Sequence, residues 1–106
     1  MPKKTTTDAT KILADIAGLD PKRKQAFEEE VANREVAQSI YELRQRAGLS
    51  QAELAKRIGT TQSVISRLED ADYEGHSLAM LNRIAAAVER RVQIRFVPRR
   101  RRLQPA

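Results

Sequence analysis

A pair of short helix signals, separated by a single glycine turn, constrains this chain more than any other feature. Residues 50–53, Ser-Gln-Ala-Glu, form a capping box, in which the serine oxygen accepts from the third helical N–H and the glutamate reaches back to the cap. Gly59 suits the left-handed cap that ends such a helix, and Thr61 caps a second helix two residues later. Two short helices joined by a tight turn predict a helix-turn-helix.

Apolar residues recur at helical spacing in both helices and in a third one, which begins after the cap Ser77. Ala55 is small enough to let the second helix approach the first. We expect one small core, mostly α-helical and poor in aromatic residues. Its predicted inward residues are Leu54, Ala55 and Ile58, then Val64, Ile65 and Leu68, and finally Leu78, Leu81, Ile84, Ala85 and Val88.

A long helix is expected before this pair. Asp20 and Pro21 have the pattern of an N-cap and a first helical position, and the run that follows favours helix up to Gly48. Phe27 and Val31 fall roughly opposite the face that we expect to pack on the core. That core-facing stripe consists of Val36, Ile40, Leu43 and Ala47.

The second face of the long helix, with Phe27 and Val31, needs a cover, and three alternatives remain open. A short helix, capped by Asp8 and ending near Gly18, would fold back over these residues. A separate protein would dock on them instead. In the third alternative, the long helix breaks near Asn33.

After the last helix, apolar and polar residues alternate with a period of two. Val92, Ile94 and Phe96 share one face of residues 91–97, and Pro98 ends the run, so the pattern predicts a β-strand. No second strand is predicted to satisfy its backbone groups. We expect antiparallel pairing with a second copy across a two-fold axis, which would bury these residues over the helical core. The alternatives are a partner protein's sheet or a frayed strand.

Length and composition fit one small domain with tails and exclude several classes of function. The chain has 106 residues and no cysteine, so it lacks disulfides, thiolate zinc sites and thiol nucleophiles. The lone His76 cannot supply a histidine metal cluster. We expect no metal, no cofactor and no enzyme activity. The longest uncharged stretch, residues 58–66, is too short for a membrane helix, which favours a cytoplasmic protein without membrane contact.

The net charge of +6 is concentrated in the C-terminal tail. Residues 90–106 hold seven arginines and no acid, so the rest of the chain is close to neutral. Global charge is therefore weak evidence for DNA binding by the folded body, and local motifs must carry that argument. The basic residues 99–102 form either a DNA-contacting tail or a solubility or partner-binding tail.

The second helix of the pair presents polar residues outward. Glutamine pairs with adenine and arginine with guanine in a bidentate way, and serine is permissive at base edges or phosphates. We therefore expect this helix to read bases in the DNA major groove; the alternative is an ordinary solvated helix face. The outward residues are Gln62, Ser63, Ser66 and Arg67.

The stretch from about Ile40 to Val97 resembles the Cro and phage-repressor-like helix-turn-helix family, often called XRE. The resemblance rests on Leu43-Arg44, on residues 47–55 and 59–63, on residues 65–69, and on Leu78, Leu81 and Ile84. It implies a five-helix lambda-repressor-like domain, preceded by a helical extension and followed by one dimerising β-strand.

The resemblance also implies roles for individual residues. Gln62, Ser63 and Arg67 would read bases, and Gln51 and Thr61 would hold phosphates. The resemblance further implies that Arg44 and Glu69 form a partly buried structural ion pair.

With its long preceding helix and following strand, the whole chain resembles a HigA-type antitoxin. This implies a partner-binding extension at residues 1–35, a DNA-binding and dimerisation domain at 36–97 and a basic disordered tail at 98–106. The expected function is an operator-binding repressor that forms a homodimer, neutralises a small basic RelE/HigB-like toxin and regulates its own operon. The alternatives are a repressor without a toxin and a helical protein-interaction adaptor.

Overall fold

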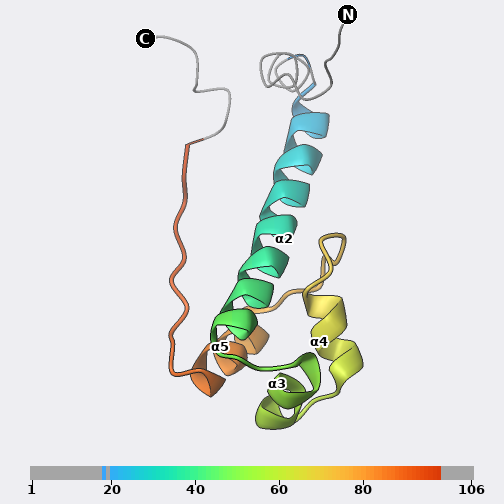
Figure 1. The fold of residues 1–106 in the computed structure, drawn as a ribbon. Helices are drawn as coiled ribbons and strands as arrows, with labels where there is room; N and C mark the ends of the chain where they lie inside the picture. Colours follow the sequence, from blue (N-terminus) through green and yellow to red (C-terminus); the bar gives the residue numbers. More distant parts are fainter. Residues whose placement is uncertain (1–17, 19, 99–106) are drawn as a thin grey trace, which may run out of the picture. The chain divides into compact units, whose positions relative to one another are not determined.

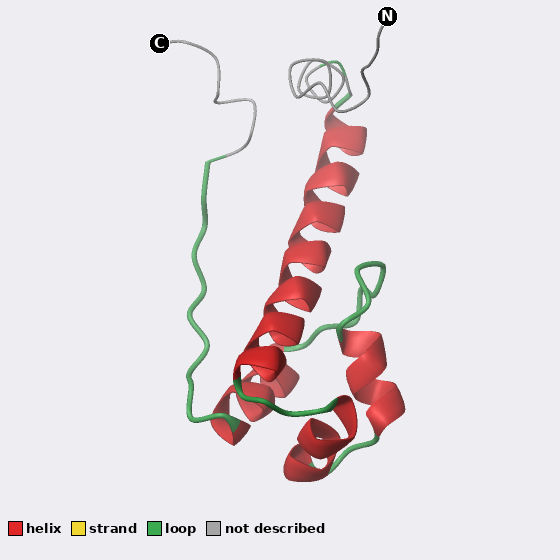
Figure 2. Ribbon diagram, in the orientation of Figure 1, coloured by secondary structure: helices red, strands yellow, loops and turns green. Residues whose placement is uncertain are grey.

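The computed structural model describes Gly18 and residues 20–98, which contain four α-helices and no strand. These are α2 (Pro21–Arg46), α3 (Gln51–Ile58), α4 (Gln62–Leu68) and α5 (Leu78–Ala87) (Figures 1 and 2). The helix predicted between Asp8 and Gly18 lies outside the described residues. The chain divides into two units, and α3, α4 and α5 all lie in the unit Glu29–Ile94.

Helix α2 begins and ends close to its predicted limits. An Asp20 carboxylate oxygen accepts from Arg23 N at 2.8 Å, so Asp20 satisfies one of the free N–H groups of the first turn. Gly48, with φ of 72°, adopts the left-handed conformation that follows the helix. Since the helix is continuous over 26 residues, the alternative in which it breaks near Asn33 is wrong.

The caps of α3 and α4 form as the sequence indicates. Glu53 N donates to Ser50 Oγ at 3.0 Å, and Ser50 N donates to the Glu53 carboxylate at 2.7 Å, which completes the capping box. Gly59 ends α3 with φ of 77°. Thr61 Oγ1 then accepts from Val64 N at 3.3 Å, so only residues 59–61 separate α3 from α4. These caps produce the tight turn on which the helix-turn-helix depends.

The core lies between α2, α3, α4 and α5. Its buried members are Ile40, Leu54, Ala55, Ile58, Ile65, Leu68 and Ile84. The inward face of α2 is centred on Ala37, Ile40 and Arg44, whereas Val36 and Leu43 are half-buried and Ala47 is exposed. The face of α2 that packs on the core is therefore rotated around the helix axis relative to the predicted one.

Leu78 was wrongly predicted to be a core residue, because it is 52% exposed. Helical spacing places Leu78 on the same face as Ala85. However, Leu78 is the first residue of α5, about one turn before Leu81, which packs against the core. The position of Leu78 at the helix end, rather than its face, leaves it exposed.

The predicted strand over residues 91–97 is absent from the structure of this single chain. A strand exists only when its backbone pairs with a neighbour, and no other described segment is a strand. In this single chain Ile94 is 62% exposed and Phe96 98% exposed. Their burial was expected only on pairing with a second copy, so it stays a prediction. No helix in the described part of the chain is long and apolar enough to cross a membrane.

Candidate nucleic-acid interface

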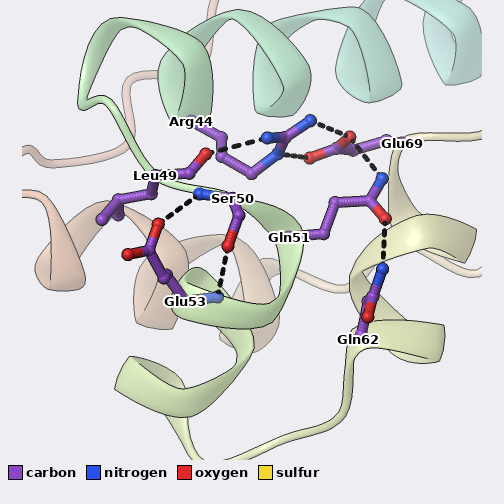
Figure 3. Close-up of polar contacts among 7 residues, drawn as sticks. All are labelled: Arg44, Leu49, Ser50, Gln51, Glu53, Gln62 and Glu69. Carbon is purple, nitrogen blue, oxygen red and sulfur yellow. Dashed lines mark hydrogen bonds and ion pairs between the residues drawn. The ribbon is translucent and has the colours of Figure 1, made fainter.

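Arg44 of α2 and Glu69, directly after α4, form a buried ion pair. Arg44 Nε donates to Glu69 Oε2 at 2.6 Å and Nη2 donates to Oε1 at 3.0 Å. Their side chains are only 8% and 6% exposed. The third guanidinium nitrogen, Nη1, donates to the Leu49 carbonyl at 2.8 Å. One arginine thus fastens the C-terminal end of α4 and the loop before α3 to the long helix (Figure 3).

The hydrogen bond to Glu69 raises the pKa of Arg44, and this effect outweighs the lowering of the pKa by burial. The guanidinium carbon also lies 5.4 Å from the centre of the Tyr41 ring, in cation–π range. Arg44 is therefore charged, paired and held on two sides.

The ion pair extends into the helix-turn-helix through Gln51, the first residue of α3. Gln51 Nε2 donates to Glu69 Oε1 at 3.1 Å. The side-chain oxygen of Gln51, Oε1, accepts from Nε2 of Gln62, which is the first residue of α4, at 3.5 Å (Figure 3). Side chains at the starts of α3 and α4 are thereby joined to one buried carboxylate.

Hydrogen-bond chemistry sets which group donates in each of these hydrogen bonds. An ionised carboxylate only accepts, so Gln51 must turn its NH₂ group toward Glu69 and its oxygen toward Gln62. Gln62 must then use its NH₂ group as the donor to Gln51. This leaves the Gln62 carbonyl oxygen and its second N–H available to an outside partner.

The predicted base-reading residues all lie on the exposed side of α4. They are Gln62, Ser63, Ser66 and Arg67, whereas Ile65 and Leu68 of the same helix are buried. Thr61 is also exposed, and its oxygen accepts from the backbone, which leaves the hydroxyl proton for a further acceptor. Gln51 is half-buried and retains one amide N–H beyond its bond to Glu69.

Two arginines that the sequence analysis did not single out connect α3 to α5. Arg83 of α5 donates to the Ile58 carbonyl at the end of α3. Arg57 of α3 donates to the Ala87 carbonyl at the end of α5, at 3.3 Å. Each cation lies at the negative end of the other helix, where it satisfies a carbonyl left free by the helix terminus. Helical spacing alone does not show such bonds, because they depend on how the two helices cross.

The loop between α4 and α5 is ordered by His76. His76 Nε2 is 2.7 Å from the Leu68 carbonyl at the end of α4, so a proton on this nitrogen donates to that carbonyl. The His76 ring packs edge-on against Tyr73, with 5.0 Å between ring centres. His76 thus holds the end of α4 to the loop that precedes Ser77. No group of three or more His, Asp or Glu residues in the described ranges is arranged to hold a metal ion.

The remaining predicted residues lie away from α3 and α4 in the sequence. Phe27 and Val31 lie in the N-terminal half of α2 and are each half-buried. Of the predicted dimerisation residues, Val92 is half-buried, and Ile94 and Phe96 are exposed. Residues 99–102 lie outside the described part of the chain.

Comparison with known families identifies one matching segment. Residues 40–89 match the family model HTH_3, described as a helix-turn-helix. The match spans the end of α2 and all of α3, α4 and α5. No curated protein and no solved structure matches the chain.

Proposed function

Because residues 40–89 are an XRE-family helix-turn-helix domain, we propose that this protein is a transcriptional regulator that places α4 in the major groove of double-stranded DNA. One observation carries the proposal: the polar residues of α4 are all exposed, whereas Ile65 and Leu68 are buried and Val64 is half-buried. Adenine offers the acceptor N7 and a donor N6 amino group, which match the free N–H and oxygen of Gln62. Arg67, one turn later, has the geometry to bind guanine.

Phosphate contacts would come from the starts of α3 and α4. The N-terminal end of a helix attracts anions through its free N–H groups and its dipole. The spare N–H of Gln51 and the hydroxyl proton of Thr61 both lie at such ends. We propose that these two residues hold the backbone on either side of the groove, while Gln62, Ser63, Ser66 and Arg67 contact base edges.

The regulator is proposed to act as a homodimer. Helix-turn-helix proteins that bind as dimers read two half-sites related by the same two-fold symmetry as the protein. The apolar alternation of half-buried Val92 with exposed Ile94 and Phe96 supports a second copy as the partner.

Selection of binding sites from a random DNA duplex library, followed by titration in fluorescence anisotropy, tests this function. The wild type should enrich one sequence motif with two-fold symmetry and bind it far more tightly than random duplex. Arg67→Ala should cost about 1–3 kcal/mol on the selected site and relax one base preference. Arg34→Ala is a charge-matched control, because Arg34 is an exposed residue of α2 outside the matched domain.

Failure to enrich any motif would refute sequence-specific regulation. Equal losses for Arg67→Ala and Arg34→Ala on specific and random DNA would refute direct base reading by Arg67. Failure to enrich any motif would favour the alternative of a helical protein-interaction adaptor.

A second candidate function adds a protein partner, as in a toxin-neutralising antitoxin. The observation that favours it is the distribution of burial along α2: its buried residues, Ala37, Ile40 and Arg44, all lie in the C-terminal half. The N-terminal half, with Phe27 and Val31, is not used by the core of the domain at residues 40–89. A toxin docked on this half would account for the length of the helix.

Coexpression with the product of the neighbouring gene tests the antitoxin hypothesis. Wild type should relieve growth arrest caused by that product, and Phe27→Ala with Val31→Ala should not. The double variant should still bind DNA, because neither residue lies in the matched domain. If the neighbouring product is harmless, or if the double variant protects fully, the function is that of a regulator alone.

A further inference from the structure

The segment after α5 exposes apolar side chains and unpaired backbone together. Phe96 is 98% exposed, Val97 69% and Ile94 62%, and they are among the most exposed large apolar residues in the described part of the chain. Among the described residues, none of the backbone hydrogen bonds outside the helices involves residues 91–98. Such a segment is a template for pairing with another strand.

We propose that residues 91–97 pair antiparallel with the same segment of a second copy, in one register, with Ile94 opposite Ile94 of that copy. The inference rests on the proposed dimeric regulator and adds the position of its two-fold axis.

The ends of the segment limit the ladder. Glu89 has φ of 59°, in the left-handed region, and Arg90 N donates to the Ala85 carbonyl at 2.8 Å, so the helix-ending turn occupies these two residues. Pro98 has no N–H to donate. The ladder is therefore confined to residues 91–97, and Ile94 is the midpoint of that range.

The faces of the strand restrict the register further. Side chains directly opposite each other in an antiparallel pair point to the same side of the sheet. If the two-fold axis lay between two residues, each even-numbered residue would face an odd-numbered one. Apolar Val92, Ile94 and Phe96 would then lie against Gln93 and Arg95. Only an axis through a residue keeps one common apolar face.

Charge then selects among the axes that pass through a residue. An axis at Gln93 would place Arg91 opposite Arg95, and an axis at Arg95 would place two copies of Arg95 opposite each other. Like charges directly opposite are destabilising. Both registers are therefore disfavoured.

The four remaining off-centre axes also fail. An axis at Arg91 would place two copies of Arg91 opposite each other, and an axis at Val97 would draw Pro98 into the ladder, opposite Phe96. An axis at Val92 would put Arg90 against Ile94 on the apolar face and leave Phe96 unpaired. An axis at Phe96 would draw Pro98 into the ladder, opposite Ile94. With the axis at Ile94, Val92 faces Phe96, Gln93 faces Arg95 and Arg91 faces Val97, so every residue of the segment is paired and no two arginines are opposed.

Cysteine cross-linking reads this register directly, because the native chain contains no cysteine. Ile94→Cys should form a disulfide-linked dimer under mild oxidation, since directly opposite Cβ atoms lie about 4.5–5.5 Å apart. Gln93→Cys and Arg95→Cys are matched controls. In the proposed register each of them lies diagonal to its own copy, about 7–8 Å away, and should cross-link at least tenfold more slowly. The double variant Val92→Cys with Phe96→Cys should also cross-link, because these positions face each other.

Sedimentation of the wild type and circular dichroism of each variant accompany the scan, so that a folded, dimeric protein is established first. Faster cross-linking of Gln93→Cys or Arg95→Cys than of Ile94→Cys would overturn the register. A monomeric wild type would overturn the pairing itself. Neither result bears on the DNA proposal, because the selection of a binding motif is measured separately. If Ile94→Cys forms a cross-linked dimer but the protein selects no DNA motif, only the DNA function is refuted.

Discussion

Glu69 accepts hydrogen bonds from Arg44 and from Gln51, so one buried carboxylate joins the long helix, the start of α3 and the end of α4. Removing either partner of the ion pair leaves an unpaired buried charge, and we expect Arg44→Met or Glu69→Leu alone to cost about 3–5 kcal/mol. The double variant should cost less than the sum of the two. Urea unfolding in a double-mutant cycle measures the coupling.

The exposed pair Arg23–Asp20 is a control for that cycle. Its side chains are 75% and 61% exposed and Arg23 Nε lies 3.9 Å from Asp20 Oδ2, so the coupling energy between the two side chains should be below about 1 kcal/mol. A coupling energy for Arg44 and Glu69 no larger than that of the exposed pair would contradict the prediction.

The capping box predicts a pH dependence of stability. The hydrogen bond from the backbone N–H of Ser50, and after it the Ser50 hydroxyl, lowers the pKa of Glu53 below its usual value. A carboxyl whose pKa is lower in the folded state contributes stability above the pKa of the unfolded state and loses it as pH falls through the folded one. The melting-temperature advantage of wild type over Glu53→Gln should therefore be constant near neutral pH and shrink below about pH 4.5. Glu30→Gln, an exposed substitution on α2, controls for the charge change, and a gap that is independent of pH would count against the mechanism.

The left-handed residues predict opposite outcomes at two helix ends. Glu89 adopts φ of 59° without the freedom of glycine, so Glu89→Gly should stabilise the domain by about 0.5–1 kcal/mol. Gly59→Ala should destabilise it by about 1 kcal/mol, because Gly59 has φ of 77°. Chemical denaturation compares the two variants, and destabilisation by Glu89→Gly would show that the Glu89 side chain matters more than its backbone strain.

The direction of the Gln51–Gln62 hydrogen bond predicts an effect on specificity. Gln51→Leu removes the acceptor that orients Gln62, so binding to the selected DNA site should weaken more than binding to random duplex. The preference for adenine at the base pair that Gln62 is proposed to contact should also weaken. Binding-site selection repeated with this variant measures both effects, and a uniform loss on all sequences would mean that Gln51 acts only as a phosphate contact.

Local signals predicted the parts of the fold that depend on neighbouring residues. The caps Asp20, Ser50 and Thr61 and the turn at Gly59 follow from hydrogen bonds within four residues, and the structure forms each of them. The exposure of Leu78 was not predictable in this way, because helical spacing gives the face of a residue and not its distance from the core.

Contacts between helices were harder to infer. Arg57 and Arg83 bond to carbonyls about 25–30 residues away, at positions that depend on the crossing of α3 and α5. The pairing of Arg44 with Glu69 came from the family resemblance, and nothing in the spacing of these two residues indicates it. The strand prediction concerned a pairing between chains, which a single chain cannot display.

Helix α4 has seven residues, too few to be stable as an isolated peptide. Its inward residues Ile65 and Leu68 and its cap Thr61 keep it folded, while Ser63, Ser66 and Arg67 are exposed and make no contribution to the core. Under the proposed function, mutations at these exposed positions should therefore change the preferred DNA sequence at nearly constant stability. Over evolutionary time, the operator preference of such a regulator is free to diverge among descendants while the scaffold stays the same.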